Sequence, residues 1–243
     1  MRRATVARAD LADPGVRVTL DDGDELSARA LVVASGMTDK LPDVPGLAER
    51  WGSSVLHCPY CHGWEVRGQR LGVLASSPMD AHRATLIRQW SEHIVFFAAA
   101  AHGVDDRDAA RLRSRGVELV TSPVTEVLGE GTSTSGVRLE DGSVVEVDAL
   151  FTGGEPVPHD RFVRHLGLER AESPMGSFLK VDAVGATSSG RIWAVGNVVN
   201  PAATVAMSMG AAAMTGGAVN MALVEEDFDH AMADGPGIGT LTR

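Results

Sequence analysis

The sequence predicts an α/β fold, because apolar runs typical of buried strands alternate with helical patterns along the chain. Ala30-Leu31-Val32-Val33 has no polar residue and suits a strand that is buried on both faces. Between about residues 68 and 152, strand patterns at Arg70–Leu74 and His93–Phe97 flank a helical pattern at Asp80–Trp90. We therefore expect helices packed against sheets in layers.

The N-terminal segment predicts short strands joined by tight turns. Thr5–Ala9 and Val16–Leu20 have strand composition, and Asp13-Pro14-Gly15 lies between them as a turn. A second hairpin signal at residues 21–24 leads into the strand that ends at Val33. The small residues Ala34, Ser35 and Gly36 follow this strand, and such residues let the backbone approach a ligand closely, as in nucleotide-binding sheets.

Cys58 and Cys61 are the only cysteines in the chain, and the motif Cys-Pro-Tyr-Cys places them three residues apart. Thiol–disulfide exchange needs a thiolate to attack and a second sulfur close enough to resolve the mixed disulfide. The spacing, with a turn-forming proline, meets the second requirement. The pair therefore predicts a dithiol that cycles to a disulfide.

Three other interpretations of the cysteine pair are open. His57 and His62 flank it, so a zinc site of two cysteines and two histidines is conceivable, although ligands so close in sequence converge poorly on one ion, and we expect no metal. A structural disulfide closing so small a loop would add little stability. Glutaredoxins share the same motif, but the segment downstream does not supply the rest of their small fold.

Composition limits the function classes. A net charge of -10 and an isoelectric point near 5.2 argue against a nucleic-acid partner. No apolar run approaches the roughly 20 residues that span a bilayer, and no hydrophobic stretch after Met1-Arg2-Arg3 suggests a signal peptide. We expect no membrane association and a cytoplasmic location, where cysteine pairs are more often catalytic than structural.

Four motifs together resemble the low-molecular-weight thioredoxin reductases and their dithiol oxidase relatives. The strand before Gly36 is similar to the family's Ala-Thr-Gly turn, and the linker at residues 41–46 follows it. The redox tetrad and the insert of strands and a helix at about residues 68–152 come next, and Gly190–Asn197 is similar to the second flavin motif. The resemblance implies two Rossmann-like three-layer domains of the FAD/NAD(P)-binding disulfide oxidoreductase type, and a homodimer.

The resemblance also predicts how the chain is divided. Residues 1–46 would be a partial first segment of the FAD-binding domain, residues 47–152 the NAD(P)-type domain with the redox pair, and residues 153–225 the C-terminal segment of the FAD-binding domain. Residues 226–243 would be a solvated tail that includes the glycine cluster Gly235–Gly239. The first FAD-binding βαβ unit, with its glycine turn, has no counterpart in the sequence.

The redox residues take their roles from the same resemblance. Cys61 would face the flavin, Cys58 would exchange with the substrate, and His62 stands where the reductases have a proton-relaying acid. An imidazole titrates near neutrality and suits that task, although His62 could also cap a helix or face solvent. The sequence from Cys58 to Gly63 looks most like that of the dithiol oxidases, and His57 is interpreted as structural.

The flavin site is expected in two segments. Asn197 stands where the family has an aspartate that binds the flavin ribityl chain, and the helix at Thr204–Leu223 would direct its N-terminus at the flavin. Its methionines, Met207, Met209, Met214 and Met221, are expected to fill the core. The residues predicted to bind FAD are Ala34, Ser35, Gly36, Gly196, Asn197, Ala203 and Thr204.

The electron partner is less well defined by the sequence. Ala75–Met79 replaces the glycine-rich turn of an NADPH site, and Ala98–Ala101 replaces its basic residues, which argues against NADPH. We expect FAD-dependent exchange with a thioredoxin-like protein or a small dithiol. The alternatives are an NADPH-dependent thioredoxin reductase and a remnant that is inactive or is completed by another chain.

Overall fold

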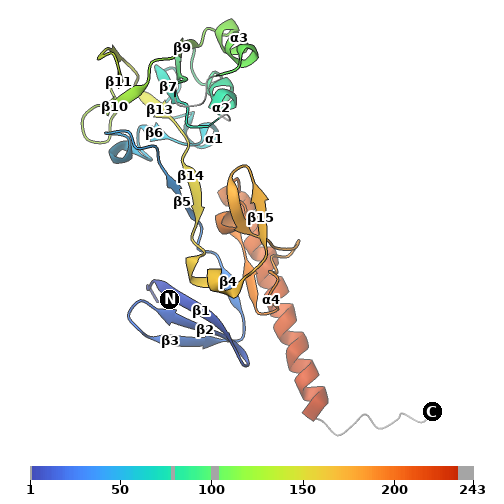
Figure 1. Ribbon diagram of the computed structural model, residues 1–243. Helices are drawn as coiled ribbons and strands as arrows, with labels where there is room; N and C mark the ends of the chain where they lie inside the picture. Colours follow the sequence, from blue (N-terminus) through green and yellow to red (C-terminus); the bar gives the residue numbers. More distant parts are fainter. Residues whose placement is uncertain (1, 78–79, 100–103, 235–243) are drawn as a thin grey trace, which may run out of the picture. The chain divides into compact units, whose positions relative to one another are not determined.

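The structure is a computed structural model that describes residues 2–77, 80–99 and 104–234. The chain divides into two compact units. Unit 1 is formed by Met1–Thr38 with Pro156–Arg243, and unit 2 by Asp39–Glu155. Each unit has its own hydrophobic core. Figure 1 labels the helices and strands of the chain.

Unit 2 is built on a five-stranded parallel sheet with the strand order β6-β13-β7-β8-β9. Every residue of β7 and β8 is buried, as their apolar runs predict. Both expected strands are therefore confirmed, each starting one residue later than predicted. The strands are β6 (Val55–Leu56), β13 (Ala149–Phe151), β7 (Leu71–Leu74), β8 (Ile94–Phe97) and β9 (Glu118–Val120).

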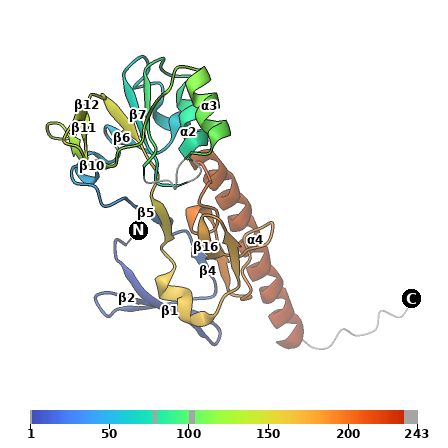
Figure 2. The same cartoon turned by 45° about the horizontal axis from the view of Figure 1, so that its top comes forward.

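Two further layers cover the faces of this sheet. Helices α2 (Asp80–Ile87) and α3 (Asp106–Ser114) lie on one face, where Ile87 and Leu112 meet Phe96 (Figure 2). An antiparallel sheet packs on the other face through residues such as Val137 and Phe97. Its strands are β10 (Val124–Leu128), β11 (Gly136–Leu139) and β12 (Val144–Val145). The expected three-layer α/β architecture is thus present in unit 2.

Unit 1 begins with the two predicted hairpins, which form an antiparallel sheet of β1 (Val6–Ala12), β2 (Gly15–Leu20) and β3 (Glu25–Ala28). Gly15 has a φ of +133°, and a Cβ there would collide with the carbonyl oxygen of Ala28. Only glycine fits this turn without a shift of the backbone. The helix η2 (Arg161–Leu166) packs on β1.

The second sheet of unit 1 joins distant parts of the sequence. Strand β4 (Leu31–Val33) pairs in parallel with β17 (Ile192–Ala194), so their carboxyl ends meet at one edge. The hairpin of β15 (Arg170–Ser173) and β16 (Gly176–Leu179) contributes Leu179 to the same core as Val33 and Ile192. After β17 comes the short helix η3 (Gly196–Val198).

Helix α4 (Val205–Asp234) is longer than the sequence predicts. The predicted tail at residues 226–243 is therefore wrong over its first part, since the helix continues to Asp234, and residues 235–243, including Gly235–Gly239, lie outside the described part. Glu226 was also expected to be solvated. Instead it binds Arg191 in a bidentate pair at 2.7 and 2.9 Å and Arg29 at 3.1 Å, which anchors this end of the helix.

The methionines of α4 were expected to fill the core, and the structure contradicts this. Met207, Met209, Met214 and Met221 are between 53% and 68% exposed, and Phe228 is 65% exposed. The packed side of the helix is narrow, with Thr215 buried against Gly185. A helix composed mainly of Ala, Gly and Met is apolar all round, so its sequence does not reveal which side is covered.

The expectation that no apolar run could span a bilayer also fails for α4. Val205–Ala233 is long and apolar enough to cross a membrane, with a mean hydropathy of 1.3 in its most apolar window. Glycine and alanine spread this apolar character over a long stretch, so no dense hydrophobic block marks it in the sequence. Length and composition alone carry no conclusion about location, because core helices of other proteins pass the same test.

Two strands carry the chain across the boundary between the units. β5 (Met37–Lys40) pairs with β14 (Glu155–Pro158) in a two-stranded sheet, and Lys40 and Glu155 form an ion pair at 3.3 Å. The compact units therefore divide at residues 38/39 and 155/156. In unit 2, the helix η1 (Ala48–Arg50) follows β5 and leads towards the redox segment.

Candidate functional site

The predicted redox cysteines lie on a single helical turn, α1 (Pro59–His62), in unit 2. Pro59 is the first helical residue and is buried, a position that suits proline because its nitrogen carries no hydrogen to be satisfied. The carbonyl of Cys58 accepts hydrogen bonds from the amides of Cys61 and His62. This turn brings the two sulfur atoms to 2.8 Å, so the spacing places the pair in direct contact.

The two thiols are not equivalent. The Cys61 thiol donates a hydrogen bond to Cys58 Sγ, and this bond, with desolvation and the charge of Glu65, raises the pKa of Cys61 to about 11. The proton therefore stays on Cys61, and the sulfur of Cys58 is the acceptor.

The two neighbouring histidines differ in their surroundings. His62 ends α1 and is half-buried beside Cys61 in the sequence. His57 packs edge-on against Trp51, with ring centroids 6.4 Å apart, and desolvation followed by the charge of Arg83 lowers its pKa. In residues 2–77, 80–99 and 104–234, no three His, Cys, Asp or Glu side chains are grouped to hold a metal ion.

Gly63 supports the redox turn, and the sequence analysis assigned it no role. A Cβ at this position would overlap Trp90 Nε1 and lie 2.5 Å from the carbonyl oxygen of Pro59. The indole of Trp90, from the turn after α2, therefore packs directly on the backbone that follows α1. No local sequence pattern predicts this contact, because Gly63 has ordinary helical backbone angles and its partner Trp90 is distant in sequence.

The predicted flavin-binding residues lie at one edge of the β4–β17 pair. Ala34, Ser35 and Gly36 follow β4, and Gly196 and Asn197 follow β17, so the parallel pairing brings the two segments to the same edge. Gly36 and Gly196 have φ values of +72° and +80°, which side chains adopt at a cost. The edge therefore presents glycine backbone, as close approach to a ligand requires.

His159 holds the first of these segments in place and was missed by the sequence analysis. The Ser35 hydroxyl donates to the carbonyl of His159 at 2.6 Å, and His159 Nδ1 lies 3.1 Å from the carbonyl oxygen of Ser35. His159 Nε2 lies 2.6 Å from Thr38 Oγ1. Because a carbonyl oxygen only accepts, Nδ1 of His159 is the donor to Ser35 in this pair of contacts.

The second segment is organised by Asn197 and Thr204. The Asn197 amide nitrogen donates to the carbonyls of Asn200, Pro201 and Ala203, so its oxygen is the atom left to accept from a ligand. Thr204 Oγ1 accepts from the amide of Met207 and caps α4. Ser35 and Thr204 therefore have structural partners already, whereas Gly36, Gly196 and Asn197 keep groups suited to a cofactor.

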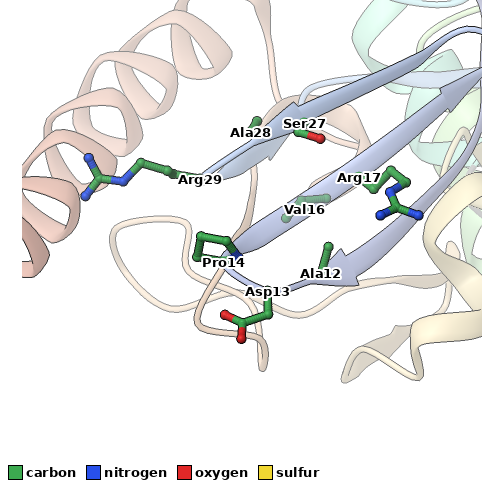
Figure 3. Close-up of a pocket in the computed structure, with 8 residues that line it drawn as sticks. All are labelled: Ala12, Asp13, Pro14, Val16, Arg17, Ser27, Ala28 and Arg29. Carbon is green, nitrogen blue, oxygen red and sulfur yellow. The ribbon is translucent and has the colours of Figure 1, made fainter.

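Two cavities in the described part of the chain lie away from these residues. One of about 290 Å³ opens at the end of the β1–β3 sheet (Figure 3), where Arg29 extends towards α4 and its acidic partners rather than into the cavity. A second, of about 330 Å³, lies beside α3 and includes Ala98 and Arg113. None of the predicted redox or flavin-binding residues lines either cavity.

Comparison with known proteins agrees with the observed fold. Residues 2–216 match the family described as pyridine nucleotide-disulphide oxidoreductase, and the chain belongs to that family. It is 31% identical over 163 residues to the thioredoxin reductase tcpT of Claviceps purpurea, which covers 61% of this chain and 48% of tcpT. The predicted thioredoxin reductase-like α/β fold is therefore confirmed.

Two solved structures are similar at higher identity. The crystal structure of HlmI is 39% identical, with a TM-score of 0.86, over 95% of this chain and 72% of HlmI. The oxidoreductase from Agrobacterium tumefaciens is 35% identical, with a TM-score of 0.83, over 92% of this chain and 74% of that protein. The chain thus spans about half the length of tcpT and about three quarters of these solved relatives.

Family membership implies FAD as a cofactor. The glycines and Asn197 at the β4–β17 edge fit part of such a site. Within residues 2–38 and 156–234, the parallel sheet has two strands, β4 and β17, and β17 leads through η3 to α4 as the one strand–turn–helix element of this described part.

Proposed function

We propose that the chain is a FAD-dependent thiol–disulfide oxidoreductase that exchanges electrons between a dithiol substrate and flavin through Cys58 and Cys61. The observation that carries this proposal is the 2.8 Å contact between the two sulfur atoms, with Cys61 donating to Cys58. Structural cysteines do not need such a contact in the reduced state. A pair that alternates between dithiol and disulfide does, because both sulfurs must meet in each cycle.

The exchange balances as a two-electron transfer. A substrate thiolate attacks Cys58 in the oxidised pair, a substrate–Cys58 bond forms, and the Cys58–Cys61 bond breaks. The second substrate thiolate attacks the substrate sulfur of this mixed disulfide and releases Cys58. The substrate leaves as a disulfide, and Cys58 and Cys61 hold the two electrons, with a proton on Cys61 as its raised pKa favours.

The other residues would hold protons and the cofactor. His62 would accept the proton that leaves a thiol during exchange, since an imidazole changes charge near neutral pH. Gly36, Gly196 and Asn197 would contact the flavin, with Ala34, Ser35, Ala203 and Thr204 forming the walls. When bound, FAD supplies the two-electron acceptor that reoxidises the thiol pair.

The substrate class and setting follow from the same proposal. A thioredoxin-like protein or a small dithiol would donate the electrons, and the name of tcpT as a thioredoxin reductase supports a dithiol of one of these kinds. We infer a cytoplasmic location, because cysteine pairs in a reducing compartment are more often catalytic than structural. Dimerisation is inferred from the family alone.

Absorbance and peroxide release test the proposal together. Protein purified with FAD is expected to absorb between about 350 and 500 nm and to release hydrogen peroxide from a small dithiol in air. Cys58→Ser and Cys61→Ser should abolish this release while keeping the absorbance. Release that survives both substitutions would exclude the cysteine pair from the reaction. Oxidation of NADPH in the presence of thioredoxin would instead identify an NADPH-dependent reductase.

A second candidate function is that of a subunit or segment completed by another polypeptide. The exposed apolar side of α4 and the two-stranded β4–β17 sheet favour it, because parallel sheets are normally covered and extended on both sides. FAD would then bind only when a further segment covers this surface. Equilibrium dialysis decides between the two: FAD retained by this chain alone contradicts the need for a further segment.

A further inference from the structure

The turn between β7 and α2 holds a buried carboxylate. Asp80 is completely buried, and its Oδ2 accepts hydrogen bonds from the backbone amides of Ser76 and Ser77, each at 2.7 Å. The hydroxyls of the same two serines donate to that oxygen at 3.2 Å. Four donors from the turn therefore converge on a single anionic oxygen.

The other oxygen of Asp80 is also paired. Arg83, one turn further along α2, donates to Oδ1, and its side chain is only 15% exposed. The positive charge that the site could offer to an incoming anion is thus already engaged. In the part of the chain that the structure describes, no buried side-chain nitrogen or oxygen of this turn lacks a partner.

The Asp80 carboxylate lies at the edge of the sheet where folds of this type bind ligands. β7 is the central strand of the parallel sheet, and the turn lies at its carboxyl end, just before α2. In open parallel sheets, ligands bind outside this edge, and phosphates are held by the backbone amides of such a turn at the start of the helix. The amides of Ser76 and Ser77 are the donors that a dinucleotide phosphate would need here.

A phosphate cannot share these donors with Asp80. Two anions at one set of amides repel each other, and moving the carboxylate aside would leave it and Arg83 without their partners in a buried setting. The Asp80 carboxylate thus occupies the donors with which this turn would bind an external anion.

We propose that the Asp80 carboxylate is an internal substitute for a phosphate group, and that unit 2 consequently does not bind NADPH or NADH. The inference goes beyond the thiol exchange proposed above, because it concerns the nucleotide domain alone and does not depend on the cysteines or on flavin. It predicts that the same turn becomes an anion site once the carboxylate is removed.

The test compares Asp80→Ala with the wild-type chain and with Asp105→Ala. Asp105 caps α3 through the amide of Asp108 at 2.7 Å, so its replacement removes one charge and one cap without touching the β7–α2 turn. NADPH binding is followed by nucleotide fluorescence, and inorganic pyrophosphate binding by calorimetry. Circular dichroism and the melting temperature establish that each variant is folded.

We expect no saturable NADPH binding by the wild type. Asp80→Ala should bind pyrophosphate about tenfold more tightly than the wild type or Asp105→Ala does. A tenfold gain in affinity corresponds to about one charge-assisted hydrogen bond. Asp80→Asn, which keeps the shape but not the charge, should show a smaller gain and serves if the alanine variant does not fold. Saturable NADPH binding by the wild type overturns the proposal. Folded Asp80 variants that gain no pyrophosphate affinity overturn it as well.

Discussion

At the scale of single residues, the redox pair is defined by where its proton lies. Cys58 and Cys61 have similar sequence surroundings, yet only one of them is a hydrogen-bond donor to the other. The pKa of Cys61 is raised chiefly because its thiol donates a hydrogen bond to Cys58 Sγ, which favours the protonated form, and then by desolvation. The two sulfurs therefore differ in their hydrogen-bonding roles.

Replacing Cys58 should lower the pKa of the Cys61 thiol. In Cys58→Ala the main cause of the raised pKa is gone, so the pKa of Cys61 should fall from about 11 towards its ordinary value of 9.0. Below pH 9 a larger fraction of Cys61 would then be thiolate and would react faster with iodoacetamide. The pH dependence of alkylation, read by mass spectrometry, measures this directly because Cys61 is then the only thiol.

Glu65→Gln in the otherwise wild-type chain is the matched control for this shift. Glu65 makes the smallest of the contributions that raise the pKa of Cys61, so the alkylation midpoint should move much less than in Cys58→Ala. An unchanged midpoint in Cys58→Ala would show that the contact between the sulfurs does not control the proton.

The contact between Cys58 and Cys61 could be predicted from sequence, but the residues that support the candidate site could not. The spacing of Cys58 and Cys61 is a local pattern, and a single helical turn is enough to realise it. His159 acts on Ser35 from more than a hundred residues away, so only the folded chain shows their contact. Asp80 is near its partners in sequence, yet nothing in its composition tells a buried carboxylate from an ordinary solvated one.

At the scale of secondary-structure elements, the position of α1 depends on Gly63, which has no side chain. Gly63→Ala would drive a methyl group into Trp90 and the carbonyl of Pro59, so α1 must shift or the indole must move. Overpacking of this kind costs about 1–3 kcal/mol of stability. The melting temperature should fall, and the alkylation rates of Cys58 and Cys61 should change with it.

Gly216→Ala provides the control for this substitution. Gly216 lies inside α4, and an added Cβ would meet no atom within 4 Å, so alanine should stabilise the helix by about 0.5–1 kcal/mol. If Gly63→Ala raised the melting temperature as Gly216→Ala should, the contact with Trp90 would not limit the redox turn.

The anchor of α4 predicts a pH dependence. Arg191 and then Arg29 lower the pKa of Glu226 from 4.5 to about 2. A carboxyl whose pKa is lower in the folded state stabilises that state above its unfolded pKa, and the contribution is lost as pH falls through the folded value. The difference in melting temperature between wild type and Glu226→Gln should therefore be constant above about pH 4.5 and shrink between pH 4.5 and 2.

Glu225→Gln tests whether this effect belongs to the ion pairs. Glu225 neighbours Glu226 in sequence and is exposed, so its substitution should leave the pH profile of the melting temperature unchanged. A difference between wild type and Glu226→Gln that persists undiminished down to pH 2 would mean that the charge of Glu226 does not hold the helix.

Secondary-structure elements that are completely buried could be predicted from sequence. The burial of elements that pack against distant parts of the chain could not. β7 and β8 are covered on both faces, so their runs of apolar residues identify them. The hairpins of β1–β3 follow from their turn residues. The exposure of α4 was predicted wrongly, because an apolar helix is expected to be covered and only the fold shows that its methionines are not.

At the scale of the whole molecule, the two compact units do not simply follow one another along the sequence. Unit 2 is one continuous segment, whereas unit 1 is made from the two segments on either side of it. No hydrophobic cluster among the described residues combines side chains from both units. Each unit therefore has the means to unfold separately, and unit 1, whose longest helix is largely exposed, should be the less stable.

We expect two thermal transitions, with unit 1 unfolding first. Trp193 is the only tryptophan in unit 1, whereas Trp51, Trp64 and Trp90 belong to unit 2. Trp193→Phe should remove the first transition from the fluorescence signal and keep it in far-ultraviolet circular dichroism, which follows both units. Added FAD should raise only the first transition, because ligands stabilise the unit that binds them. Coincident transitions in both signals would show that the two units unfold as a single cooperative body.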